Sequence, residues 1–508
     1  MNEMKSSGAM TGRTVQASIW LLSGVIYGRA ANLLMTIILA RILAPRDFGL
    51  VALGTTLLVI LSAVTDLALS NALVHHQDAT KDDYDTAFTL GVLRGILLAA
   101  IMLAGGFVMA AVYTDSRLVW IGVGLASRPL LSGIASPYYV KYVKELKFGT
   151  VAITEALNYT AQLVISVAVA LLTHSYWAIV AGLVAASFVG VTSTFRVAPY
   201  RPHFTLKSWR KIMHFSIWVT LTQTITMIGN RFDNFLAGGM LGISTFGAYN
   251  VGNNVSAMIT QSAIIPLERV LFPSFAKITH DRERLKAAFQ KAQASLFAIG
   301  LPLGVGLALV AEPFVYLTLG PKWSVAVTVI EYVAPVLGVQ VVFGPSSALA
   351  FAMGATRTLF VRSLIMLALR GPIVLFGLYF YGLEGLLIAR TISGGVLVSV
   401  VNAYMVRSMI GVSPWEQVKV TWRSIVAGLA MTGAVLAMKS VLPNVTNVET
   451  AAISLAVLVP TGALVYGGMH VALWFASGRP GRAIETEIAN YIAKISVRLS
   501  GRRRQAAE

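Results

Sequence analysis

Arginines lie inside several long apolar segments of this chain, where a charged side chain is costly. An arginine at the centre of a membrane helix costs about 3 kcal/mol on insertion scales, so it must pair, reach the interface or face a wet cavity. The guanidinium also binds phosphate through paired hydrogen bonds. These residues therefore predict an anionic ligand, and the candidate ligand-binding arginines are Arg29, Arg128, Arg370, Arg231 and Arg269. Of these, Arg29, Arg128 and Arg370 lie nearest the middle of their segments.

Acidic residues inside the apolar segments are fewer than the arginines. They are Asp66, Glu155, Asp233, Glu268 and Glu331. Each is a candidate for ion coupling, and the alternative role is that of a partner to an arginine. Because the balance of charge within these segments is basic, an anionic ligand is favoured over a cationic one.

Polar side chains recur at helical spacing along several of the same segments. One stripe combines Glu155, Asn158, Gln162 and Ser166, and another combines Arg128, Ser132 and Ser136. A single stripe is usually a contact between helices. Stripes in both halves of the chain instead predict a central hydrophilic cavity, whose candidate amide residues are Asn32, Gln162, Asn230, Asn234, Asn250 and Asn254.

The composition identifies the elements that must position these residues. The 508-residue chain is 56% hydrophobic and 12% charged, whereas globular chains carry about 25% charged residues. Apolar runs of roughly 20 residues recur from end to end, and each can cross a bilayer as a helix. We therefore predict an all-α polytopic membrane protein with about 14 transmembrane helices.

The net charge of +18 follows the predicted topology. With the N-terminus in the cytoplasm, most Lys and Arg residues fall in cytoplasmic loops and tails, as the positive-inside rule requires. No nucleic-acid partner is therefore expected, and both termini are predicted to be cytoplasmic. The chain has no cysteine, its His residues are scattered, and it contains no P-loop or nucleophile motif. We expect no metal, no cofactor and no enzymatic activity.

A short internal repeat divides the chain. Aligning Leu43 with Leu241 places Phe48-Gly49 on Phe246-Gly247, and in both places a long apolar segment enters and another leaves. Repeats of this kind are common in transporters. We predict two pseudo-symmetric six-helix lobes, at residues 1–211 and 212–411. Two extra helices at 412–478 and a basic cytoplasmic tail at 479–508 complete the chain.

Five sequence blocks, taken in order, resemble those of the polysaccharide (Wzx-type, oligosaccharide) flippase family. The blocks span residues 39–50, 66–74, 136–148, 175–180 and 266–273, and the first reads Leu-Ala-Arg-Ile-Leu-Ala-Pro-Arg-Asp-Phe-Gly-Leu. The resemblance implies the multidrug/oligosaccharidyl-lipid/polysaccharide exporter fold, with two lobes around a cavity that opens alternately to either side. It covers roughly residues 15–410.

The resemblance also implies a ligand and a location. The ligand would be an oligosaccharide repeat unit on polyprenyl diphosphate, moved across the bacterial inner membrane for exopolysaccharide, capsule or O-antigen synthesis. Arg29 is the candidate for the diphosphate by its position in the first span, and the amide stripes would meet the sugar hydroxyls. A polysaccharide polymerase and export complex are the expected protein partners. An ion-coupled drug exporter of the same fold is the alternative.

Overall fold

The structure is a computed structural model in which the described residues form helices and no strand. It describes residues 2–478 except 66–68, 70–72, 74–78, 146, 211–223, 225–226, 228, 230–231 and 263–264. Side chains are described for these residues except at 2–19, 21–22, 143, 262 and 265–269. The prediction of an all-α protein is confirmed.

The first half of the chain contributes the helices α1 (Asn2–Ile42), α2 (Pro45–Val64), α4 (Lys81–Tyr113), α5 (Arg117–Gly133), α6 (Val140–Lys144), α7 (Phe148–Thr173), α8 (Trp177–Val197) and α10 (Ile243–Ser262). The second half contributes α11 (Ile265–Ala276), α12 (Arg282–Leu309), α13 (Ala311–Thr318), α14 (Ser324–Gln340), α15 (Gly344–Ala352), α16 (Thr356–Arg390), α17 (Val398–Ile410), α18 (Pro414–Lys439) and α19 (Val448–Ala476). The 3₁₀ turns are Pro137–Tyr139, Pro321–Trp323 and Val341–Phe343, and a π-helical segment, Thr391–Leu397, joins α16 to α17.

Within the described residues, ten helical segments are long and apolar enough to cross a membrane. Large apolar side chains cover their outer surfaces, including Val112 on α4 (68% exposed), Leu172 on α7 (83%) and Leu464 on α19 (75%). Such surfaces suit contact with lipid tails rather than water. The chain is therefore a multi-pass membrane protein, while the number of 14 spans stays a prediction.

The chain forms two compact units. Unit 1 contains Met1–Val251, Thr318–Val325 and Leu378–Leu383, and unit 2 contains Gly252–Leu317, Ala326–Gly377 and Glu384–Glu508. The predicted lobe boundaries at residues 211 and 411 stay predictions, as do the limits of the two extra helices. The tail at 479–508 lies outside the described residues.

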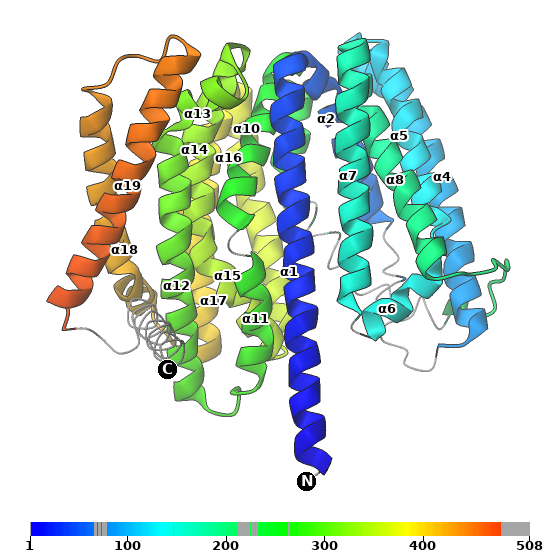
Figure 1. Ribbon diagram of the computed structural model, residues 1–508, viewed down its shortest axis with the longest axis horizontal. Coiled ribbons are helices and arrows are strands. Elements are labelled where there is room, and N and C mark those ends of the chain that lie inside the picture. The colour runs from blue at the N-terminus through cyan, green and yellow to red at the C-terminus, as the bar shows by residue number, and fades with distance from the viewer. Residues whose placement is uncertain are drawn as a thin grey trace, which may run out of the picture. The chain divides into compact units, whose positions relative to one another are not determined.

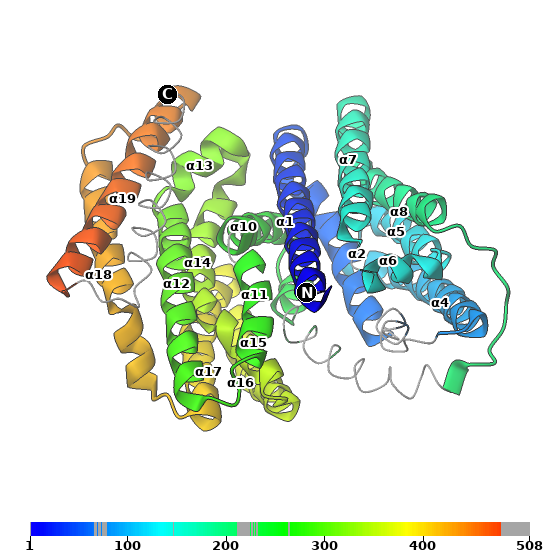
Figure 2. The same cartoon turned by 60° about the horizontal axis from the view of Figure 1, so that its bottom comes forward.

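Helices α4, α5, α7 and α8 pack in unit 1, and α1 packs along α7 (Figures 1 and 2). Small residues allow the close approach. A Cβ atom on Gly95 of α4 would lie 2.6 Å from the Pro129 carbonyl oxygen of α5, and one on Gly28 of α1 would lie 2.4 Å from the Tyr159 ring of α7. Close packing through small residues is the usual way in which membrane helices associate, because burial from water cannot drive the contact.

The sequence block at residues 39–50 forms the connection between α1 and α2. Helix α1 ends with carbonyl groups that have no partner within the helix. The Trp323 indole Nε1 donates to the Ala40 carbonyl oxygen at 2.9 Å, and the Lys322 ammonium donates to that of Arg41 at 3.0 Å. Pro45 then begins α2, and the Phe48 ring packs edge-on against Trp323. Side chains from a segment about 280 residues later in the chain thus donate hydrogen bonds to the free carbonyl groups at the end of α1.

The two glycines that the repeat pairs, Gly49 of α2 and Gly247 of α10, lie at one reciprocal contact. A Cβ atom on Gly49 would lie 1.9 Å from the Ile243 carbonyl oxygen, and one on Gly247 would lie 2.0 Å from that of Pro45. Gly49 faces Ile243, four residues before Gly247, and Gly247 faces Pro45, four residues before Gly49. Such a reciprocal pattern is the one that a two-fold axis through the helix crossing produces. The repeat thus appears in the packing, and at this crossing only glycine leaves room for the backbone.

The long element α16, which belongs to unit 2 except at Leu378–Leu383, contains a reversal of direction. Gly382 has φ +57° and ψ −133°, outside the helical region. A Cβ atom on Gly377 would lie 2.4 Å from the Gly385 carbonyl oxygen, whereas eight residues of straight helix span about 12 Å. The chain therefore turns back at Gly382. Elsewhere in unit 2, α18 and α19 pack against α12 through an apolar cluster that includes Met431 and Leu458.

Candidate functional site

A polar cavity of about 370 Å³ lies in unit 1 between α5, α7 and α8. Its lining includes Arg128 and Ser132 from α5, Glu155, Asn158, Tyr159 and Gln162 from α7, and Ser187 and Gly190 from α8. The structure therefore brings the predicted stripe on α7 and the predicted arginine on α5 together at one site. Such a set of charged and amide groups between membrane-length helices can hold a polar ligand away from lipid.

Most polar groups of this cavity have few partners in the protein. The Arg128 Nε donates to the Ser187 Oγ at 3.3 Å. The Asn158 Oδ1 is buried and has no hydrogen-bond partner among the described residues, and Gln162 makes no side-chain hydrogen bond within them. Buried polar groups normally carry hydrogen bonds, so groups left without them at a cavity indicate a ligand or solvent contact.

Gly190 determines how close Asn158 can lie to α8. A Cβ atom at Gly190 would lie 3.3 Å from the Asn158 Nδ2, so the glycine leaves space for the amide. Deeper in the helix pair, Ser166 is fully buried against Gly182, beyond the cavity lining. The stripe thus divides into residues that line the cavity and one serine in the contact between helices.

Arg29 lies on α1 beside the same cavity. The ring of Tyr159, which lines the cavity, packs against Gly28, and Tyr159 is close enough to Arg29 for electrostatic interaction. The hydroxyls of the neighbouring residues Tyr27 and Thr160 are 2.6 Å apart and add a polar contact between the two helices. Within the described residues, Arg29 makes no ion pair with an acid. Asn32 follows it on α1 and is partly buried.

A second cavity of about 410 Å³ adjoins the first and shares Ser132 and Ala135 with it. Its lining is largely apolar, with Leu98 and Phe88 among the side chains, and its charged residue is Arg94. The Arg94 guanidinium donates to the Ser62 carbonyl oxygen at 2.8 Å and to the Thr65 hydroxyl at 3.3 Å. This arginine is therefore engaged in holding α4 against α2.

Unit 2 also carries arginines along its membrane segments. Arg370 lies on α16 and is partly buried. Arg362, on the same helix, contacts the Ser347 hydroxyl at 3.5 Å, and its Nε is buried without a partner among the described residues. Glu331 on α14 is exposed and lies near the ion pair of Lys439 with Glu312, in which nitrogen and oxygen are 3.2 Å apart.

The remaining predicted residues are distributed as follows. Asp233 and Asn234 are buried, whereas Asn250 and Asn254 are partly buried on α10. Asp66, Asn230 and Arg231 lie outside the described residues, as do the side chains of Glu268 and Arg269. The roles of all these residues stay predictions.

The sequence matches a known family over more than half its length. The profile of the family described as "Polysaccharide biosynthesis protein" matches residues 38–328. The chain belongs to this family. Among relatives, the chain is 22% identical to the lipopolysaccharide biosynthesis protein WzxC of Escherichia coli, over 81% of the chain and 84% of that protein. It is 27% identical to the succinoglycan biosynthesis transport protein ExoT of Rhizobium meliloti, over 59% of the chain and 60% of that protein.

A solved structure shows which fold the chain has. The lipid II flippase MurJ in an inward closed conformation aligns with 91% of the chain and 100% of its own, with a TM-score of 0.73 and 13% identity. The likeness confirms the exporter fold that the sequence blocks imply.

Two residues of the cavity between α5, α7 and α8 carry no signal in the sequence. Tyr159 and Ser187 line the cavity, but neither belongs to a polar stripe or to a charged set. Arg362 is likewise absent from the arginines that the sequence predicts as ligand-binding. In sequence, a lone arginine near the start of a membrane helix cannot be distinguished from one whose side chain extends to the membrane–water interface. Their positions follow from the rotation of α7, α8 and α16 in the fold.

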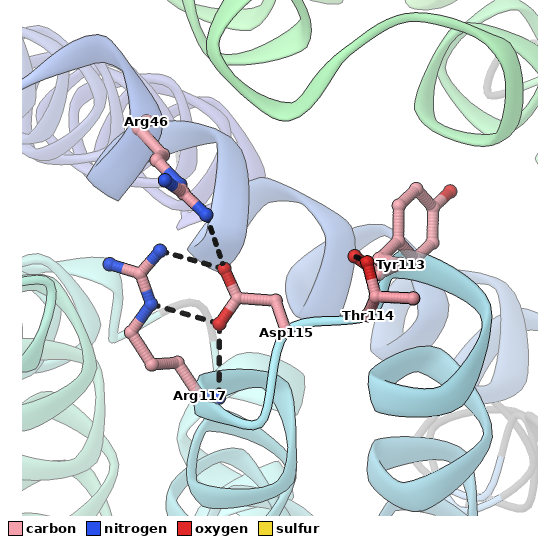
Figure 3. A network of polar contacts seen from close by, with 5 residues as sticks. All are labelled: Arg46, Tyr113, Thr114, Asp115 and Arg117. Atoms are coloured by element: carbon pink, nitrogen blue, oxygen red, sulfur yellow. Dashed lines mark hydrogen bonds and ion pairs between the residues drawn. The ribbon is translucent and has the colours of Figure 1, made fainter.

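A second polar network lies at the other end of α5, in the connection from α4. The Asp115 carboxylate lies between two guanidinium groups, with Arg117 at 2.7 Å and Arg46 at 3.0 Å (Figure 3). Asp115 also accepts a hydrogen bond from the Arg117 backbone N–H at 3.1 Å. The Arg117 side chain, helped by this N–H and by Arg46, lowers the pKa of Asp115 to about 2. The network ties the start of α2 to the start of α5.

Proposed function

We propose that this protein translocates polyprenyl-diphosphate-linked oligosaccharide repeat units from the cytoplasmic to the periplasmic leaflet of the bacterial inner membrane. The movement proceeds by alternating access and serves exopolysaccharide, capsule or O-antigen synthesis. Relatives are described as a lipopolysaccharide biosynthesis protein and a succinoglycan biosynthesis transport protein, which supports this substrate class. The protein moves its substrate and leaves the bonds of that substrate unchanged.

The observation that carries the proposal is the polar cavity between membrane-length helices in a chain of this family. Arg128, Glu155, Asn158 and Gln162 there offer a mixture of donors and acceptors that a lipid-facing surface would not tolerate. A lipid-linked sugar needs such an environment for its polar head, while its prenyl tail stays in the bilayer. Arg29, beside the cavity, supplies the positive charge for the diphosphate.

The arrangement in the membrane follows the distribution of positive charge. Both termini lie in the cytoplasm, and the exposed basic segment at residues 201–210 lies on the same side. On the periplasmic side, a polysaccharide polymerase and an export complex receive the translocated units. Arg370, Arg231 and Arg269 are further candidates for diphosphate contacts, and Asp66, Asp233, Glu268 and Glu331 for ion coupling.

The test is the sidedness of the lipid-linked repeat unit in a strain that lacks the protein. We expect the intermediate to accumulate in the cytoplasmic leaflet, and the wild-type gene to restore its exposure to the periplasm. An Arg29→Ala protein at the same level in the membrane is expected to restore little exposure. If the intermediate reaches the periplasmic leaflet without the protein, the proposed function is wrong.

A further inference from the structure

The connection that follows α8 forms a strap across the start of α4. This strap, residues 200–210, leaves the end of α8 and passes round α4 (Figures 1 and 2). The Thr205 backbone N–H of the strap donates to the Thr89 hydroxyl at 3.0 Å, and the Ser208 N–H donates to the Thr86 hydroxyl at 3.2 Å. Both threonines are buried in α4, so these hydrogen bonds fix the strap at one level along that helix.

The exposed apolar side chains of α4 indicate where this level lies in a bilayer. They extend from Leu93 to Val112, which corresponds to about 28 Å of helix. This length matches the hydrocarbon core of a bilayer, which is about 30 Å thick and has about 5–8 Å of headgroup region on each side. Thr89 and Thr86 lie about 6 and 10 Å beyond Leu93 along the helix. The strap is therefore held at the level of the lipid headgroups.

The strap exposes large apolar side chains at this level. Phe204 is 67% exposed and Trp209 is 47% exposed, and Leu206 between them is exposed as well. Phe204 contacts the Phe88 ring of α4, with the ring centroids 5.7 Å apart, and still leaves most of its surface uncovered. Aromatic side chains are enriched at the headgroup level because their apolar rings can enter the edge of the hydrocarbon core. The exposed rings thus favour contact with lipid.

The strap is also basic along its length. It contains Arg201, Lys207 and Arg210 and no acidic residue. Within the part of the chain that the structure describes, Arg201 and Arg210 form no ion pair, and the Lys207 ammonium lies 3.7 Å from the exposed Asp82 carboxylate. Basic segments next to membrane helices are attracted to the anionic headgroups of the cytoplasmic leaflet. The charges and the exposed rings therefore favour the same neighbour.

We propose that the strap binds anionic phospholipid of the cytoplasmic leaflet. Its three basic side chains contact the lipid phosphates, and Phe204, Leu206 and Trp209 enter the edge of the acyl-chain region. The occupant is lipid because the patch lies at the headgroup level, beside the exposed apolar surface of α4. Since the strap is bonded to Thr86 and Thr89, bound lipid stabilises the start of α4. The site is separate from the polar cavity and does not depend on which substrate is transported.

The first experiment measures the depth of the strap in the membrane. Because the chain has no cysteine, a nitroxide can be attached to a single cysteine in the full-length protein. We expect labels at Phe204→Cys and Trp209→Cys, in nanodiscs that contain phosphatidylglycerol, to collide more often with dissolved oxygen than with a water-soluble nickel chelate. Thr279→Cys, in the exposed connection before α12, is the control and should show the opposite preference.

The second experiment measures selectivity for the anionic headgroup. A triple variant combines Arg201→Gln, Lys207→Gln and Arg210→Gln, and its thermal unfolding in detergent is followed with added phosphatidylglycerol or phosphatidylcholine. We expect phosphatidylglycerol to raise the unfolding temperature of the wild type more than phosphatidylcholine does. In the triple variant this rise should fall by more than half. High salt should weaken the effect on the wild type in the same way, because it screens exposed charges.

The matched control removes three basic residues from another exposed connection. It combines Lys277→Gln, Arg282→Gln and Arg284→Gln, where the acidic residues Asp281 and Glu283 lie beside the positive charges. Its response to phosphatidylglycerol is expected to equal that of the wild type, and the unfolding transition of each variant shows that it is folded.

Three outcomes overturn the inference. One is an equal response of the wild type to the two lipids, and another is an undiminished response of the triple variant to phosphatidylglycerol. The third is a preference of both strap labels for the nickel chelate, which would place the strap in water. The proposed function is tested separately, by the sidedness of the lipid-linked intermediate, so the two can fail independently.

Discussion

At the scale of single residues, Arg128 is the positively charged group in the lining of the cavity between α5, α7 and α8. Its replacement by alanine removes charge-assisted hydrogen bonds, which contribute about 1.5–3 kcal/mol each. We expect Arg128→Ala to lower the translocation rate of the lipid-linked repeat unit in proteoliposomes at least tenfold. Arg128→Lys keeps the charge but loses the planar set of donors, so an intermediate rate is expected.

The control for this change is Arg196→Ala, which removes an arginine that is exposed at the end of α8. Its rate is expected to match that of the wild type. A wild-type rate for Arg128→Ala at equal reconstitution would show that the cavity does not contact the substrate.

Asp115 gives a pH dependence whose sign follows from its pKa. The Arg117 guanidinium and backbone N–H, with Arg46, hold this pKa at about 2, against an ordinary value of 3.8. Because the pKa is lowered in the folded protein, the carboxylate stabilises the fold above about pH 4, and this contribution of about 2 kcal/mol is lost as the pH falls towards 2. We expect Asp115→Asn to lower the free energy of unfolding by a similar amount at pH 7.

Thermal unfolding in detergent between pH 2.5 and 7 measures this effect. The difference in stability between wild type and Asp115→Asn should shrink as the pH falls through the range from 4 to 2. Glu145→Gln is the matched control, because Glu145 is 54% exposed in its ion pair with Lys147 and surface pairs contribute little. A difference that stays constant with pH would show that Asp115 acts by packing alone.

At the scale of elements, the reciprocal contact of Gly49 with Gly247 explains why both repeats carry glycine at this position. A methyl group at either position would meet a backbone carbonyl, which cannot move away as a flexible side chain can. We expect Gly49→Ala and Gly247→Ala each to destabilise the protein by about 1–3 kcal/mol, as overpacking typically does. Because both changes disturb one crossing, their effects should not add.

Gly242→Ala is the control for the glycine pair. It lies just before α10 and has no atom within 4 Å of the position that its Cβ would take. Its thermal unfolding is expected to match the wild type. If Gly49→Ala unfolded at the same temperature as Gly242→Ala, the crossing of α2 and α10 would not be as close as the structure has it.

The sequence predicts the elements better than it predicts their faces. The spacing of Glu155, Asn158 and Gln162 identifies one face of α7, and that face does line the cavity. Spacing within one helix carries no information on its rotation against another, so Ser187 of α8 was not predicted as the partner of Arg128. Likewise, no local pattern links Trp323 to the end of α1, 283 residues away.

Some helices begin earlier than the apolar pattern indicates. Asp83 and Asp85 carry charged side chains, yet both are buried in the first turns of α4. Tyr200 donates a hydrogen bond to the Asp85 carboxylate, and the Thr205 backbone N–H donates to Thr89 Oγ1 at 3.0 Å. The segment after α8 thus covers the start of α4 and satisfies polar groups that would otherwise be costly to bury.

At the scale of the whole molecule, the absence of cysteine allows the predicted orientation to be tested directly. Single cysteines at Ser116 and Asn444 lie in exposed connections predicted to face the periplasm, and those at His203 and His280 in exposed connections predicted to face the cytoplasm. The positive-inside rule predicts this orientation because basic loops remain in the cytoplasm. In intact spheroplasts we expect a membrane-impermeant maleimide to label only the first two positions. Labelling of all four after permeabilisation shows that each thiol is accessible, and the reverse pattern in intact cells would invert the direction of transport that we propose.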